Sequence, residues 1–293
     1  MPYWIPDATL GCGRRQVGHS EFMRWTEEEA QREYRKNHSH FSLIIPSCGR
    51  STLENTVNSA LYQLPAPNEI IVVGSRRPNI EAPNLKFIFF NNGGCDESGL
   101  SSLAGSDQQQ GWHSAYGTDV GTTEHDIGYA YATGGYLAHC DDDDIFLPGA
   151  FNVMRKAMLS AHDFSALHLF RMRYGCHEQW LSPHCGREGI HCIAQKQADW
   201  TISQWGHQSI VTPNWELVPR WRIFNRDKTM ASDWSHIKRY IEVTKTTPEA
   251  HMDVIGIIRP TMKDLVECLP PGTVIPQPLR YAPQPGWNGV PRQ

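Results

Sequence analysis

Four consecutive aspartates, Asp141 to Asp144, form the segment of this sequence with the clearest potential for chemistry. Neighbouring carboxylates repel one another, so such a run is hard to pack unless it faces water or a cation. The run directly follows Tyr136-Leu-Ala-His-Cys140, an apolar segment that is predicted to be a buried strand. Carboxylates held at a strand end suit Mg²⁺ or Mn²⁺, which prefer hard oxygen ligands and accept more from substrate phosphates. Asp141 and Asp143, spaced one residue apart, are the predicted metal ligands.

A second interpretation of this run is a solvated acidic turn in front of the helix predicted for residues 148–161. The strand before the run favours the metal interpretation, because ligands of open α/β folds bind at the carboxyl ends of the strands. Asp144 is predicted to cap or support the turn rather than to bind the ion.

A strand–helix–strand unit is predicted ahead of the aspartates. Phe41-Ser-Leu-Ile-Ile-Pro46 is a short apolar run, and Ser51 or Thr52 is expected to cap the helix that follows. The second strand is predicted at Glu69-Ile-Ile-Val-Val-Gly74. Both strands end at the same edge of the sheet, so the ligand crevice should border residues 47–50 and 74–77.

The remaining pattern alternates strands and helices, which predicts an α/β fold with a mixed, mainly parallel central sheet flanked by helices. Further strands are predicted at residues 86–90, 136–140, 165–172 and 209–212. Further helices are predicted at residues 124–133, 148–161, 232–241 and 261–269. The polar, glycine-rich residues 91–123 are predicted to form a lid over the crevice.

Composition argues against several classes of protein. Lys and Arg total 27 against 31 Asp and Glu, a net charge of −4, which lacks the signature of a nucleic-acid binder or a polybasic membrane anchor. No apolar run is long enough to span a membrane, and the first residues lack the layout of a signal peptide, so a cytoplasmic location is expected. The eight cysteines are scattered, and reduced thiols are expected.

Three segments, residues 41–61, 69–73 and 132–148, resemble glycosyltransferase family 2, inverting enzymes with the Rossmann-like GT-A fold. The resemblance covers residues 41–160 and, more weakly, extends to about residue 245. It implies a metal-dependent, hexosyltransferase-like enzyme that moves a sugar from a nucleotide-sugar donor to an acceptor hydroxyl with inversion. The implied organisation is an extension at 1–40, a GT-A domain at 41–269 and a proline-rich arm at 270–293. Within the domain, 41–160 would bind the donor and 161–269 the acceptor.

The resemblance also implies roles for individual residues. Asp141 and Asp143 would contact Mn²⁺ or Mg²⁺ and the donor diphosphate, with Asp142 in the same site. His251 would supply a third metal ligand, and Asp233 would act as the general base, with helix N-cap as its alternative role. The nucleoside would be bordered by Pro46, Ser47, Cys48, Arg50, Gly74 and Ser75.

Three departures from the family pattern concern the donor: two leave its base open, although UDP is favoured, and the third concerns its diphosphate. Gly74 and Ser75 stand where the family has an aspartate that reads the base, and Cys48-Gly49 replaces an aromatic or polar pair. Glu124-His-Asp126 replaces Ala-Arg-Asn, which removes a cation expected near the diphosphate. The alternative sources of that cation are Arg50, Arg76 and Arg77.

Two other functions remain open: a nucleotidyltransferase on a related fold, and a catalytically silent carbohydrate-binding protein. The acceptor is equally open among a glycan, a lipid, a protein, a small metabolite and a hydroxylated DNA base. Cysteines and histidines between residues 176 and 192 cluster, but their spacing misses the usual zinc knuckle. His207 is a candidate for the acceptor pocket.

Overall fold

The structure is a computed structural model that describes residues 3–7, 13–17, 40–91, 121–161, 163, 165–175, 207–214, 232–258 and 260–273. Side chains of residues 3–7, 13–17, 174, 207 and 232–235 fall outside this description. Among the described residues, no helix is both long and apolar enough to cross a membrane.

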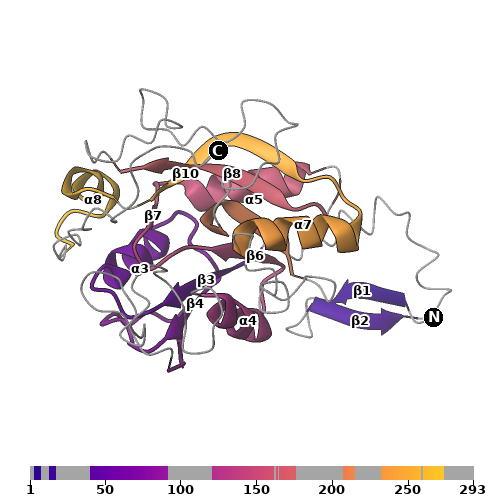
Figure 1. The fold of residues 1–293 in the computed structure, drawn as a ribbon, viewed down its shortest axis with the longest axis horizontal. Helices are drawn as coiled ribbons and strands as arrows, with labels where there is room; N and C mark the ends of the chain where they lie inside the picture. The colour runs from indigo at the N-terminus through magenta and orange to yellow at the C-terminus, as the bar shows by residue number, and fades with distance from the viewer. Residues whose placement is uncertain are drawn as a thin grey trace, which may run out of the picture.

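A single eight-stranded sheet organises the chain from residue 41 onward, with strand order β5-β4-β3-β6-β9-β8-β10-β7 (Figure 1). Its strands are β3 (Phe41–Ser47), β4 (Glu69–Gly74), β5 (Leu85–Phe89), β6 (Tyr136–His139), β7 (Ile145–Phe146), β8 (His168–Tyr174), β9 (Ile210–Pro213) and β10 (Glu249–Ile258). Two more strands, β1 (Tyr3–Asp7) and β2 (Gly13–Val17), form a separate antiparallel pair.

The first half of the sheet is parallel: β5, β4, β3 and β6 pair side by side in one direction. Every residue of β3 and β4 is buried, as expected for strands covered on both faces. This explains why their sequences are continuous apolar runs rather than alternating ones.

The second half is mixed. β9 pairs antiparallel with both β6 and β8, β10 pairs parallel with β8, and the short β7 pairs antiparallel with β10 at the edge. Two antiparallel steps through β9 restore the original direction, so β8 and β10 run the same way as β3 and β6. The predicted class, α/β with a mixed, mainly parallel sheet flanked by helices, is confirmed.

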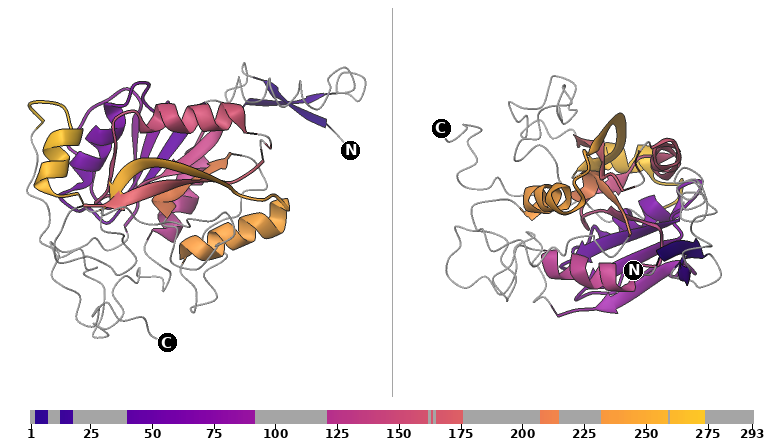
Figure 2. Two further views of the ribbon diagram at one scale, coloured as in Figure 1. Left: turned by 90° about the horizontal axis from the view of Figure 1, so that it is seen from above. Right: turned by 90° about the vertical axis from the view of Figure 1, so that its right-hand side faces the viewer.

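Helices cover both faces of the sheet, and the left view of Figure 2 shows α5 and α7 on opposite sides. On one face, α3 (Leu53–Leu61) and α5 (Ala150–Ser160) bury apolar residues against Phe41, Leu43 and Ile45. On the other, α4 (Thr122–Tyr131) and α7 (Ser232–Thr244) pack around Ile44. A third cluster joins α8 (Met262–Cys268) to β7 and β10.

Most predicted elements are present, but several boundaries were wrong. α4 begins and ends two residues before its predicted limits. α5 begins at Ala150, after Gly149, which has a left-handed backbone conformation with a φ of 84°. Pro148 therefore precedes the helix instead of lying in its first turn. β7, β10 and the β1–β2 pair were not predicted. Most of the predicted lid, the C-terminal arm and the 176–192 cluster lie outside the described residues.

Candidate functional site

The aspartate run lies at the carboxyl end of β6, next to the carboxyl end of β3. The two strands are parallel neighbours with Ile44 opposite His139, and the Cys140 amide donates to the Ile44 carbonyl at 3.2 Å. This confirms that the run follows a buried strand. It also places the aspartates at the edge of the sheet where open α/β folds bind ligands.

The backbone of the aspartate turn is held by hydroxyl groups from α3. Thr52 Oγ1 donates to the Asp142 carbonyl at 2.8 Å, and Thr56 Oγ1 donates to the Asp144 carbonyl at 2.6 Å. Thr52 is the N-cap residue of α3, but its side chain makes no capping hydrogen bond. The predicted capping role was therefore wrong, because the hydroxyl is used to fix the neighbouring turn.

Asp142 is buried and paired with Arg50. Its Oδ1 lies 2.5 Å from Arg50 Nη1, its Oδ2 accepts a hydrogen bond from Ser47 Oγ at 2.8 Å, and both ionic side chains are almost fully buried. Burial raises the pKa of Asp142, although the Arg50 guanidinium opposes the shift. Asp142, Arg50 and Ser47 thus join the loops that follow β6 and β3.

The other three aspartates converge. Asp141, Asp143 and Asp144 each offer a carboxylate oxygen, and these oxygens all lie within 4.8 Å of one another. Asp143 Oδ1 is also 3.5 Å from Arg50 Nη1, and Asp144 Oδ2 accepts a hydrogen bond from Gln208 Nε2 at 2.7 Å. The structure therefore brings the two predicted metal ligands together and adds Asp144, which was predicted only to support the turn. Three hard oxygen donors fit Mg²⁺ or Mn²⁺.

Gly74 has a structural reason to be glycine. A Cβ atom built there would lie 2.0 Å from the Ser47 carbonyl oxygen, a backbone atom of the adjacent strand. The aspartate that the family carries at this position would require β3 and β4 to separate. Next to it, Ser75 Oγ lies 3.4 Å from the Cys48 carbonyl oxygen, so both predicted nucleoside-contacting residues take part in the packing of this edge.

The three arginines considered as cations near a diphosphate have different surroundings. Arg50 is committed to Asp142, as above. Arg76 forms a bidentate pair with Glu54 at 2.8 Å for both bonds and also donates to the carbonyls of Gly49 and Arg50. Arg77 lines a cavity of about 320 Å³, together with Pro78, Ile80, Glu81, Ala82, Pro83, Leu85 and Phe87. Of the three, Arg77 is the one that lines this cavity.

Two more predicted nucleoside neighbours lie at the end of β3. Pro46 is buried in this strand and would be 3.3 Å from a Cβ built on Gly121, the residue before α4. Cys48 is disulfide-bonded, which corrects the expectation of a reduced thiol for this residue. Its role as a polar contact for a nucleoside stays a prediction.

Histidines pack directly behind the aspartate run. His139, the last residue of β6, has Nδ1 at 3.2 Å from His125 Nδ1 and Nε2 at 3.2 Å from the Tyr129 hydroxyl. His125 and Tyr129 both belong to α4, and all three residues are buried. The segment Glu124-His-Asp126, which replaces the family's Ala-Arg-Asn, therefore contributes His125 to the packing against His139.

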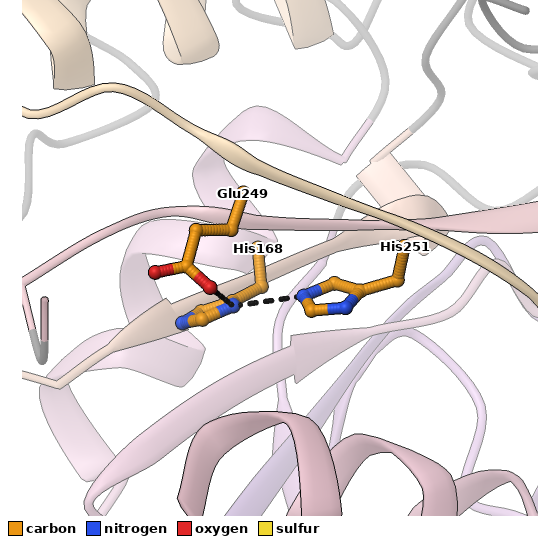
Figure 3. A group of neighbouring side chains, drawn as sticks. All are labelled: His168, Glu249 and His251. Atoms are coloured by element: carbon orange, nitrogen blue, oxygen red, sulfur yellow. Dashed lines mark hydrogen bonds and ion pairs between the residues drawn. The ribbon is translucent and has the colours of Figure 1, made fainter. Parts of the chain in front are cut away.

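His251 does not lie with the aspartates, so the prediction that it is a third ligand of the metal ion held by them is wrong. Within the described residues, its possible ligand atom groups with those of His168 and Glu249 instead (Figure 3). His168 is the first residue of β8 and Glu249 the first of β10, so this group lies at the amino ends of strands parallel to β6. The aspartate run instead follows β6, which is separated from β8 by β9, and His168 is level with Ala138 through that strand. Burial lowers the pKa of His251, opposed by Glu249 and Asp253.

Asp233, the predicted base, is the second residue of α7, and its side chain lies outside the described residues. Because α7 begins at Ser232, Asp233 lies in the first turn of the helix rather than at the N-cap. His207 opens a short 3₁₀ turn, η3 (His207–Ser209), whose next residue, Gln208, is the one that reaches Asp144. Gln208, Thr56, His168 and Glu249 had no distinguishing pattern in the sequence.

Comparison with known proteins gives a distant structural likeness only. No family model matches the chain, and no curated protein matches it by sequence. The crystal structure of S. aureus TarS residues 1–349 aligns at 16% identity and a TM-score of 0.47, over 78% of this chain and 63% of TarS 1–349. A longer TarS structure aligns at 16% identity and a TM-score of 0.48, over 78% of this chain and 38% of the TarS chain.

The TarS fragment has also been solved with UDP, and that structure aligns at 14% identity and a TM-score of 0.47. This chain spans less than two thirds of the length of each of these structures. Identities this low, with TM-scores below 0.5, establish neither a family nor an activity for the chain.

Proposed function

We propose that this protein is a glycosyltransferase that moves a sugar from a nucleotide-sugar donor to an acceptor hydroxyl with inversion. The observation that carries the proposal is the convergence of Asp141, Asp143 and Asp144 at the carboxyl end of β6, beside the end of β3. A nucleotide diphosphate is a ligand for which that edge of a sheet is suited. The sequence resemblance to glycosyltransferase family 2 supports the same reading.

The three carboxylates would hold Mn²⁺ or Mg²⁺, because all their ligand atoms are hard oxygens. Bound there, the ion would neutralise negative charge that develops on the leaving nucleoside diphosphate. The protein's own part is to keep the carboxylates together against their repulsion. Thr52 and Thr56 fix the backbone of the turn, and Arg50 offsets the charge of Asp142 and stands 3.5 Å from Asp143.

The chemical step also needs a base on the acceptor side, and Asp233 is the proposed one. Its carboxylate would take the hydroxyl proton while the acceptor oxygen bonds to the anomeric carbon. The bond from that carbon to the diphosphate oxygen breaks with its electron pair leaving on the diphosphate. Attack from the face opposite the leaving group inverts the anomeric configuration.

The metal assignment is tested by titrating UDP and UDP-GlcNAc calorimetrically in Mn²⁺, and then in EDTA. We expect measurable binding with the cation and at least a tenfold loss of affinity without it. Asp143→Asn should lose affinity to a similar extent, because it removes one anionic ligand and keeps the size of the side chain. Asp253→Asn is the matched control, since Asp253 is exposed on β10 and should leave donor affinity unchanged.

Donor affinity that is the same in EDTA as in Mn²⁺, with Asp143→Asn like the wild type, would exclude the metal site. A second candidate, a carbohydrate-binding protein without activity, draws on the packing at Gly74, where the base-reading aspartate of the family does not fit. Release of UDP from a panel of nucleotide sugars separates the two, because only an enzyme turns over the donor.

A further inference from the structure

Two histidines and a glutamate meet at the amino ends of β8 and β10, away from the aspartate run. His168 and Glu249 are directly opposite each other in the parallel ladder, and His251 follows Glu249 by two residues. Because side chains alternate along a strand, Glu249 and His251 project from the same face of the sheet. Figure 3 shows the three side chains turned toward one another.

The distances place three ligand-type atoms around one point. His168 Nδ1 is 3.0 Å from His251 Nε2 and 3.9 Å from Glu249 Oε2. One ligand atom from each residue lies within 4.8 Å of the others. Ligands bound tetrahedrally to zinc at about 2.0–2.1 Å are separated by about 3.3–3.4 Å, so small side-chain rotations would bring these atoms to that spacing.

Burial gives the group a rigid side and an open side. His168 is fully buried, whereas the Glu249 side chain is 29% exposed and His251 is half-buried with its ring stacked on Phe170, centroids 4.5 Å apart. An ion would therefore enter from the Glu249 side. It would meet two imidazole rings whose positions are already limited by packing.

We propose that His168, Glu249 and His251 form a binding site for a zinc-class divalent metal ion. Two imidazole nitrogens and one carboxylate oxygen are a ligand set found in proteins that bind zinc through three side chains. Imidazole suits zinc and its neighbours in the first transition series, whereas the all-oxygen aspartate group suits Mg²⁺ and Mn²⁺. The protein would then separate two kinds of metal by ligand chemistry.

The site would stabilise an irregular part of the β8–β10 ladder. The register between the two strands shifts between Ala250 and Val254, a stretch that contains His251. An ion bound to His168 on one strand and to Glu249 and His251 on the other would join the strands where their hydrogen bonds are interrupted. This role is independent of the proposed sugar transfer.

The competing explanation is a simple hydrogen bond, in which one neutral imidazole donates to the other at 3.0 Å. The test is calorimetric titration of the metal-stripped protein with ZnCl₂, together with thermal unfolding at increasing zinc. We expect zinc to bind and to raise Tm by mass action. We expect His251→Phe, which keeps the ring on Phe170, and Glu249→Gln, which keeps the side-chain size, each to lose one equivalent of zinc or to bind it at least tenfold more weakly.

His40→Gln is the matched control, because it removes an exposed histidine outside the group and should leave zinc binding unchanged. Asp143→Asn should also leave it unchanged, which keeps this outcome distinct from failure of the proposed donor site. Far-UV circular dichroism confirms that each variant is folded, and Glu249→Gln serves if His251→Phe is not. Zinc that does not bind the wild type, or that binds both folded variants as it binds the wild type, overturns the proposal.

Discussion

At the scale of single residues, four identical side chains in a row have different surroundings. Asp142 turns inward to Arg50 and Ser47, while Asp141, Asp143 and Asp144 bring their carboxylates together. Burial of an unpaired carboxylate is costly, so the inward aspartate needs its arginine. The cation considered for a bound diphosphate is thus used inside the protein, where it offsets the charge of the run itself.

Arg50→Met tests whether buried Asp142 depends on Arg50. It removes the cation, keeps much of the side-chain length and leaves a buried carboxylate unpaired, so we expect unfolding free energy at pH 7 to fall by about 3–5 kcal/mol. Arg239→Met is the control, since Arg239 pairs with Glu242 on the exposed side of α7 and should cost below about 0.5 kcal/mol. Urea denaturation of both variants measures the difference.

The same variant has a pH dependence of known sign. In the wild type the pKa of Asp142 is already raised by burial, so the native state binds the extra proton and its stability falls as pH rises through that window. Without Arg50, which opposes the shift, the folded pKa rises further. The loss of unfolding free energy in Arg50→Met relative to the wild type should therefore become smaller as pH is lowered and larger as pH is raised. A deficit independent of pH would contradict a role for the ion pair.

At the scale of elements, the sequence predicts what depends on local pattern. β3 and β4 are continuous apolar runs with clear ends, and they are found within one residue of prediction. The helix α3 begins as predicted but ends at Leu61, so Leu64, predicted on its apolar face, lies outside it and is exposed. β10 begins with Glu249-Ala-His-Met-Asp253, a polar segment without strand pattern, and its pairing with β8 is what makes it a strand. β7 has two residues and depends wholly on β10.

Pairings between distant residues decide the rest of the site. The aspartate run was located correctly because a buried strand leads directly into it. Arg50 and Asp142 are 92 residues apart, and His168 and His251 are 83 apart, so no local spacing reveals either contact. His251 was assigned to the aspartates for this reason: its neighbours are set by the pairing of β10 with β8.

Asp233→Asn is the prediction for helix α7. The helix is fixed by Ile237 and Tyr240, which are fully buried, and the Tyr240 hydroxyl donates to the Ser165 carbonyl at 2.8 Å. If Asp233 is the base, sugar transfer should fall by about 10²-fold or more with donor affinity unchanged. Steady-state rates and calorimetric donor binding are the measurements, with Glu242→Gln on the same helix as control.

A structural role for Asp233 gives a different result. A carboxylate in the first turn of a helix stabilises it by about 0.3–1 kcal/mol through the helix dipole, and Asn loses most of that while activity is retained. Near wild-type transfer by Asp233→Asn with a slightly lower Tm would therefore remove Asp233 as the base.

At the scale of the whole molecule, one sheet carries two distinct groups of ligand-type side chains. The carboxylates of Asp141, Asp143 and Asp144 follow the carboxyl end of β6, and His168, Glu249 and His251 gather at the amino ends of β8 and β10. The strands between them are parallel or restored to parallel through β9. The two groups share no residue, and on the proposals above their ligand atoms would favour different metals.

The whole-molecule prediction is that stabilisation by the two metals is additive. Thermal unfolding is measured with Mn²⁺ and UDP, with Zn²⁺, and with all three; the free energies should sum within about 0.5 kcal/mol, as for distant sites without shared partners. Asp143→Asn should abolish the Mn²⁺–UDP response and keep the zinc response, and His251→Phe should do the reverse. If either substitution removes both responses, the ions compete for one site or the sheet couples the two groups, and their independence fails.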